Sequence, residues 1–246
     1  MKAGFLSLAL CAAVAPNAHA QMTWTDKAFV NVTGGAQAGS HTVATSAQFD
    51  LYEEQGTVSS SQKVKGGGLF DLSAGYRVRK NLVAGIGFSS TGSKADAAIT
   101  ASVPDPRVFD QPRTVTATAP GLKHRENAVH LFAAWMVPVT DKIDVGISAG
   151  PSIFMVKQDL ATALSVTEPG PVVSQITTEK SSKTTAGINI GVDVTYLVSK
   201  RWGVGGLARY TWGSVDLKNA TDKLTVGGFQ IGAGLRLRFQ SVMGRK

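Results

Sequence analysis

The chain has 246 residues, with 25 Lys and Arg, 17 Asp and Glu, and a single cysteine, Cys11. One cysteine excludes a disulfide scaffold and a cysteine-based zinc site, and a hydrophobic content of 43% excludes a disordered tail. After residue 20 no stretch approaches the ~18 consecutive apolar residues of a membrane helix, so the abundant glycine and the alternating pattern favour β-sheet.

The first twenty residues have the layout of a secretory signal peptide. Lys2 supplies a positive start, residues 5–14 form an apolar run, and Ala18-His19-Ala20 is a small-x-small cleavage motif. We therefore expect residues 1–20 to be removed and residues 21–246 to form one domain. A buried N-terminal helix and a lipoprotein modified at Cys11 are weaker alternatives, because the run ends in a cleavage motif and a large residue precedes the cysteine.

Apolar and polar residues then alternate with a period of two, which is typical of strands with one apolar face. Such strands come in pairs around three tight turns, at residues 79–81, 140–142 and 199–201. A first strand begins near Ala28 and a last one ends at Phe239. The pattern predicts eight antiparallel strands in an all-β fold.

The spacing of aromatic residues suggests that the apolar face meets lipid and not a second sheet. Trp202 and Trp212 are ten residues apart on one face, and so are Phe229 and Phe239. Ten residues at roughly 3.3 Å rise, tilted by ~40°, span about 25 Å of height, which is the thickness of the lipid-facing band of a membrane barrel. The sequence thus predicts a transmembrane β-barrel.

Short and long connections alternate, as they do between the periplasmic and extracellular sides of such barrels. The long connections run roughly over residues 37–66, 92–126, 155–184 and 213–226. The first three contain turn-forming centres flanked by strand-like residues, so we expect protruding β-ribbons. With their flanks the long connections hold equal numbers of acidic and basic residues, and the positive excess is expected at the short-turn end, where a basic rim suits anionic headgroups.

The polar face carries charges of both signs among small residues, which leave room for a few long side chains in the narrow lumen of an eight-stranded barrel. These charges are Asp71, Arg77, Asp144, Asp193, Arg209, Arg236 and Arg238. Unpaired charges in a tight interior are costly, so we interpret them as a structural ion-pair network. A binding or proton-relay role is the alternative.

These features together resemble the small outer-membrane β-barrel family of Gram-negative bacteria, which includes OmpA-, OmpX- and OmpW-like barrels. The final strand, Leu235-Arg236-Leu237-Arg238-Phe239, is similar to the signal that the barrel-assembly machinery reads in that family, although here residues 240–246 follow it. The resemblance implies a bacterial outer-membrane location, short periplasmic turns and long extracellular loops. It leaves the function open, because function varies widely on one fold.

Signals for catalysis, cofactors or metals are weak. The chain after residue 20 has three histidines, His41, His124 and His130. Some outer-membrane barrels act on lipid A through a Ser-His-acid set, and Glu126 lies four residues before His130, but His130 faces the interior by parity, whereas such a base must lie near the bilayer face. We therefore expect no catalytic, cofactor-binding or metal-binding residues and no cofactor.

The leading hypothesis is a monomeric, non-enzymatic outer-membrane barrel with an envelope-structural or surface-interaction role. A narrow channel for small or apolar solutes is the alternative, since interior glycines such as Gly85, Gly146 and Gly205 could leave space. A lipid A-modifying enzyme comes third. Expected partners are outer-membrane lipids including lipopolysaccharide, and the barrel-assembly machinery; nucleic acid is not expected, because the basic residues are not interleaved with stacking aromatics.

Overall fold

The computed structural model describes residues 23–217, 220 and 223–240, so the predicted signal peptide lies outside the described residues. Ten strands account for almost all of this part of the chain. They are β1 (Asp26–Ala38), β2 (Ser40–Leu51), β3 (Glu54–Lys65), β4 (Gly68–Arg79), β5 (Leu82–Asp105), β6 (Val108–Pro138), β7 (Ile143–Thr167), β8 (Val172–Leu197), β9 (Trp202–Val215) and β10 (Leu224–Gln240). No helix able to span a membrane is found among these residues.

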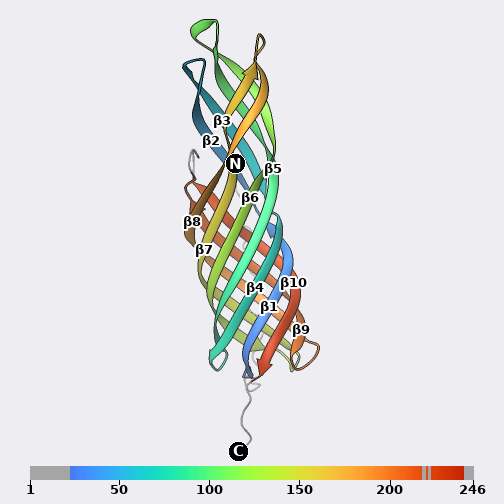
Figure 1. Ribbon diagram of the computed structural model, residues 1–246. Helices are drawn as coiled ribbons and strands as arrows, with labels where there is room; N and C mark the ends of the chain where they lie inside the picture. The colour runs from blue at the N-terminus through green and yellow to red at the C-terminus, as the bar shows by residue number, and fades with distance from the viewer. Residues whose placement is uncertain (1–22, 218–219, 221–222, 241–246) are drawn as a thin grey trace, which may run out of the picture.

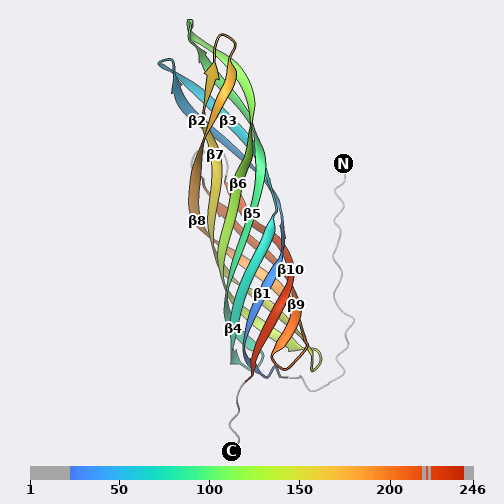
Figure 2. The same ribbon diagram turned by 45° about the vertical axis from the view of Figure 1, so that its right-hand side comes forward.

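Eight of these strands close into a barrel. Each pairs antiparallel with its neighbours in the order β1-β4-β5-β6-β7-β8-β9-β10, and β10 returns to β1 over a register that runs from Asp26–Gln240 to Ala38–Phe229. Figure 1 shows the strands tilted around a tall, narrow ring, and Figure 2 shows the same closure after a turn of 45°. The prediction of an eight-stranded antiparallel barrel is confirmed, with the three tight turns at one end.

The remaining two strands correct one detail of the prediction. Residues 40–65 do not continue the wall strands upward but form a separate hairpin, β2–β3, whose strand β3 pairs with the upper part of β5 over Thr57–Ser102 to Gln62–Ala97. Gly66 and Gly67 connect β3 to β4, and at this point the chain passes close to the backbone of Gln37 and Gly92. A Cβ at Gly66 would lie 1.8 Å from the carbonyl oxygen of Gln37, so only glycine permits this close crossing.

The upper halves of β5–β6 and β7–β8, together with β2–β3, form three ribbons that rise beyond the ring (Figures 1 and 2). The ribbons share a hydrophobic core of their own, separate from the side chains inside the ring. Its buried members are Val58, Ala97, Ile99, Ala101, Val103, Val115, Ala119, Leu122, Ala161 and Leu164. The first three long connections are therefore ribbons, as predicted, and they pack together as an extension of the barrel.

Candidate functional site

Besides a longer contact of 3.9 Å between Asp26 and Arg238, three close Asp–Arg ion pairs occupy the lumen of the ring. They join Asp71 to Arg209, Asp193 to Arg236 and Asp144 to Arg238, with N–O distances of 2.5, 2.6 and 2.8 Å. Arg77 instead donates to the backbone carbonyl of Trp24. Six of the seven charges thus pair between different strands and confirm the predicted ion-pair network, whereas for Arg77 no ion pair is found within the described residues.

Large neighbouring side chains fill the space beside two of the interior glycines. A Cβ at Gly85 would lie 2.3 Å from the ring of Phe132, and one at Gly205 would lie 2.8 Å from Nε of Arg236. A cavity beside Asp71 in the lumen has a volume of about 40 Å³. That is room for a few water molecules.

The upper lumen is crossed by one chain of hydrogen bonds between buried side chains. Arg209 Nε donates to Gln230 Oε1 at 2.8 Å, Gln230 Nε2 donates to Gln37 Oε1 at 2.7 Å, and Gln37 Nε2 donates to Glu126 Oε2 at 3.1 Å. Each of the three links has an amide group at one end or both, and amide groups do not give up protons as acids do. The chain therefore fixes side chains in place across the upper lumen.

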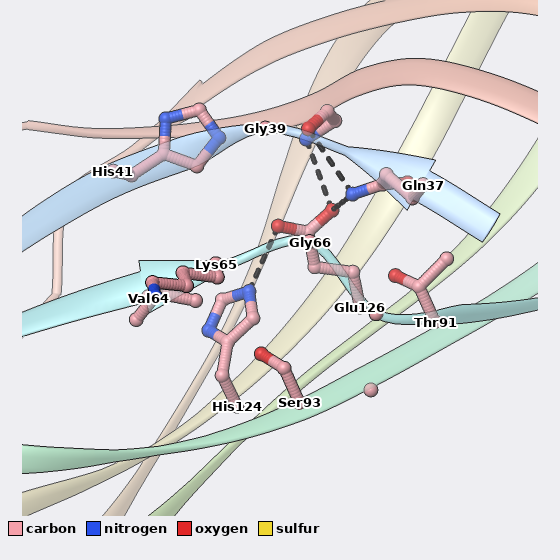
Figure 3. A pocket seen from close by; sticks show the side chains of 13 residues that line it. Gln37, Gly39, His41, Val64, Lys65, Gly66, Thr91, Ser93, His124 and Glu126 are labelled. Atoms are coloured by element: carbon pink, nitrogen blue, oxygen red, sulfur yellow. Dashed lines mark hydrogen bonds and ion pairs between the residues drawn. The ribbon is translucent and has the colours of Figure 1, made fainter.

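Glu126 and His124 lie at the mouth of the ring, and Figure 3 shows the Glu126 carboxylate between the side chains of His124 and Gln37. His124 Nε2 lies 2.8 Å from Glu126 Oε1, and Nδ1 lies 2.6 Å from Gln158 Oε1. The other carboxylate oxygen of Glu126 accepts the backbone N–H of Gly227 at 3.0 Å. With Gln37 this cluster ties β1, β6, β7 and β10 together across the barrel mouth, and a cavity of about 10 Å³ lies beside it.

The histidines do not form a Ser-His-acid set. Ser93 lies across from His124 in the β5–β6 register, and its buried hydroxyl has no hydrogen-bond partner in the described part of the chain. Both ring nitrogens of His124 are already engaged, so neither is placed to take a proton from Ser93. His130 is buried between Ser89 and Ser152, at 2.9 and 2.7 Å, and no carboxylate bonds to its ring.

The residues that the structure describes contain no group of three or more His, Cys, Asp or Glu side chains placed to hold a metal ion.

The tips of the ribbons are joined by a charged cluster. Arg113 on β6 donates to both carboxylate oxygens of Glu168, from Nη1 at 2.9 Å and Nη2 at 2.6 Å. Arg113 Nε also lies 3.5 Å from Asp105, and the Tyr52 hydroxyl donates to Glu168 at 3.5 Å. The Arg113 side chain, by hydrogen bonding, holds the pKa of Glu168 below its ordinary value. All three ribbons are thereby tied at their ends.

The outward face of the ring is apolar from one aromatic row to the other. Tyr76, Trp135, Tyr196, Trp202 and Phe239 lie near the tight turns, while Trp212 and Phe229 lie near the ribbons, and each is about half exposed. Between them the outward residues are mostly Leu, Ile, Val, Ala and Gly. So much exposed apolar surface on a closed barrel with a polar lumen is stable only in a bilayer.

The chain is a transmembrane β-barrel of the bacterial outer-membrane type. No protein-family model matches it, and no curated protein does. Among solved structures it is similar to Neisserial surface protein A, with 15% identity, 86% of this chain and 97% of that chain covered, and a TM-score of 0.46.

Two further solved structures are similar to the barrel at a lower level of identity. The outer membrane protease OmpT of Escherichia coli has 11% identity, 89% and 98% coverage and a TM-score of 0.46. Ail of Yersinia pestis has 11% identity, 85% and 99% coverage and a TM-score of 0.38. These likenesses are too weak to carry a role from any of these proteins to this barrel.

The amides of the lumen are the feature that sequence reasoning missed. Gln37, Gln62, Gln158 and Gln230 are all nine-tenths or more buried and link the charged groups to one another. The alternation of residues shows that these glutamines point inward, but their hydrogen-bond partners lie on strands that are distant in the sequence. Trp24 was also missed: it is buried under the ring, and its Nε1 donates to Asp144 at 3.4 Å.

Proposed function

We propose that this barrel is a non-enzymatic surface-interaction protein whose ribbons present a contact surface outside the cell. The observation that supports this is a rigid, separately packed extension that ends in bare apolar side chains. Phe109 and Val172, at the tips of two different ribbons, are 72% and 68% exposed. Apolar groups held on a tied scaffold lose little conformational freedom when they bind a partner, which favours affinity.

The alternatives have less support in the geometry. An envelope-structural role needs the ring but gives no reason for the ribbon core. A channel for small or apolar solutes needs a continuous path, whereas charged and amide side chains occupy the lumen around Arg209, Glu126 and Gln158. A lipid A-modifying enzyme needs a free base beside a hydroxyl, and both nitrogens of His124 are engaged.

Attachment of bacteria that carry the variant Phe109→Ser/Val172→Ser tests the proposal. We expect weaker attachment to host cells or matrix than with the unchanged protein, at equal surface amounts. Val198→Ser is the matched control, because Val198 is also 68% exposed but lies in a tight turn at the opposite end of the barrel. Equal attachment by the Phe109→Ser/Val172→Ser variant and the control would contradict a contact surface at the tips.

Conductance measurements on the refolded barrel in planar bilayers separate the contact role from the channel. A filled lumen is expected to give no stable open-channel steps. Steps that persist in the unchanged protein and grow when Arg209 is replaced by Ala would favour the channel instead.

We also propose that the barrel is a monomer and that the barrel-assembly machinery inserts it. The ring closes on itself through β1 and β10, so no strand edge of the ring remains for a second copy. Chemical crosslinking in outer-membrane preparations should give a single-copy species.

A further inference from the structure

Five cations lie together on the outward face of β5 to β8, where the ring gives way to the ribbons. They are Lys94, Lys123, Arg125, Lys157 and Lys180, all exposed. The strand register arranges them in two rows. The lower row is Gly92, Arg125, Lys157 and Ser182, and the upper row is Lys94, Lys123, Asp159 and Lys180. We call this surface the basic patch.

The register brings like charges directly opposite one another in the basic patch. Lys94 is the cross-strand partner of Lys123, and Arg125 is the cross-strand partner of Lys157. Like charges directly opposite destabilise a sheet. Within the described residues none of the five cations forms an ion pair, so the protein does not itself neutralise this repulsion.

Two acids lie beside these cations, and both are bonded to backbone N–H groups. Asp159 accepts the N–H of Lys123 at 3.2 Å, and Asp96 accepts the N–H of Gly121 at 2.8 Å. With five cations and two acids, the formal charge of the patch is 5 minus 2, or +3. The long connections were expected to hold equal numbers of acidic and basic residues, but the basic ones are thus concentrated in this patch.

The shape of the basic patch leaves the charged groups accessible. Small residues, Gly92, Ser181 and Ser182, lie between the lysines, and the patch borders an open depression of about 950 Å³. A depression of this size, ringed by ammonium and guanidinium groups with hydroxyls beside them, can take several phosphate oxygens at once.

The position of the basic patch relative to the apolar band indicates which anion can bind there. On β7, Lys157 follows the outward residue Met155 by two positions, and on β6, Arg125 lies four positions beyond Val129. Two to four residues at roughly 3.3 Å rise and ~40° tilt place the lower row about 5–10 Å above the apolar band. This is the level of the lipid headgroups on the ribbon side.

We propose that the basic patch is a binding site for the phosphate groups of a phosphorylated glycolipid in the outer leaflet, such as the lipid A part of lipopolysaccharide. Acyl chains of the same lipid lie against the apolar face of β5 to β8 below the patch, while its phosphates neutralise the opposed Arg125 and Lys157. The site is independent of the contact surface proposed for the ribbon tips. It also lies at the opposite end of the barrel from the basic turns.

The test uses the refolded barrel in zwitterionic bilayer discs containing diphosphoryl lipid A, with bound lipid counted by native mass spectrometry. The variant Arg125→Gln/Lys157→Gln should bind about tenfold to thirtyfold more weakly. Arg107→Gln/Lys223→Gln is the matched control, because it removes the same charge from two exposed positions outside the basic patch and away from the tight turns, and it should bind as the unchanged protein does. In discs without lipid A, the patch variant should melt at the same or a higher temperature, since its repulsion is gone.

Each remaining outcome counts against the site. Equal binding by the patch variant and the control would overturn it. So would equal binding of lipid A whose phosphates have been removed, which would assign the affinity to the acyl chains. Competition by millimolar inorganic phosphate alone would indicate a free-phosphate site. Binding of a soluble sulfated polysaccharide without binding of lipid A would assign the patch to an extracellular polyanion.

Discussion

Asp71 and Arg209 stand 138 positions apart in the sequence and meet inside the lumen, with 2.5 Å between Oδ2 and Nη2. Arg209→Met should therefore destabilise the barrel by about 3–5 kcal/mol, because it leaves the Asp71 carboxylate buried without its partner. The double variant Asp71→Leu/Arg209→Met should recover much of this loss. Urea titration of the barrel refolded in lipid vesicles measures both. Arg79→Gln, in an exposed turn, is the control and should change stability by less than about 0.5 kcal/mol.

The two faces of β7 are tested by neighbouring residues. Ile147 points outward and is 51% exposed, whereas Ser148 points into the lumen and donates to the carbonyl of Gly191 at 3.4 Å. Ile147→Arg should cost roughly 2–4 kcal/mol at the bilayer midplane. Ser148→Arg should impair folding by crowding, and should do so equally in thin and thick bilayers. A neutral Ile147→Arg would mean that this face does not meet lipid.

Acid should loosen the ribbon tips before it affects the ring. The pKa of Glu168 is lowered below its ordinary 4.5 because Arg113 hydrogen-bonds to the carboxylate. A group with a lowered pKa in the folded state stabilises above its ordinary pKa and loses that contribution as the pH falls through the folded value. Amides near residues 104–113 and 165–171 should therefore be less protected at pH 3 than at pH 6, when each exchange rate is divided by the intrinsic rate of an unprotected amide at the same pH. Arg113→Gln should remove this difference, and exchange in β9 should serve as the unchanged reference.

Replacing residues 97–121 by a short Gly/Ser turn should leave the ring intact. The ring strands pair below this segment, and a change in loop length costs only about 0.6 kcal/mol per doubling. Heat-modifiable migration of outer-membrane extracts on gels should show a folded barrel. Because β3 pairs only with residues 97–102 of β5 outside its own hairpin, β2–β3 should become protease-sensitive. Loss of membrane assembly would show that the ring needs the ribbons.

Much of the ring follows from the sequence because its determinants are local. The alternation of apolar and polar residues around residues 140–142 indicates that Ile147 faces lipid and Ser148 faces the lumen. The ten-residue spacing of Trp202 and Trp212 indicates the height of the lipid-facing apolar band. These features need no knowledge of distant strands, and the structure confirms that Ile147, Trp202 and Trp212 face outward.

What the sequence could not provide depends on pairing between distant strands. Nothing near Thr57 signals that it lies across from Ser102, because a hairpin can dock on any free edge of suitable length. The same holds for the basic patch. Lys94 and Lys123 are separated by a proline-rich excursion, and only the register of β5 and β6 sets them opposite each other.

The continuity of the long strands has a mechanical consequence. β5, β6, β7 and β8 each run without interruption from the tight turns at the base to the ribbon tips (Figures 1 and 2). A pull applied at a tip is directed along these strands, so it loads many interstrand hydrogen bonds in shear at once instead of opening them one by one. A cell held by its ribbon tips would thus transmit the drag of flowing liquid through the strand backbones directly into the membrane-embedded ring.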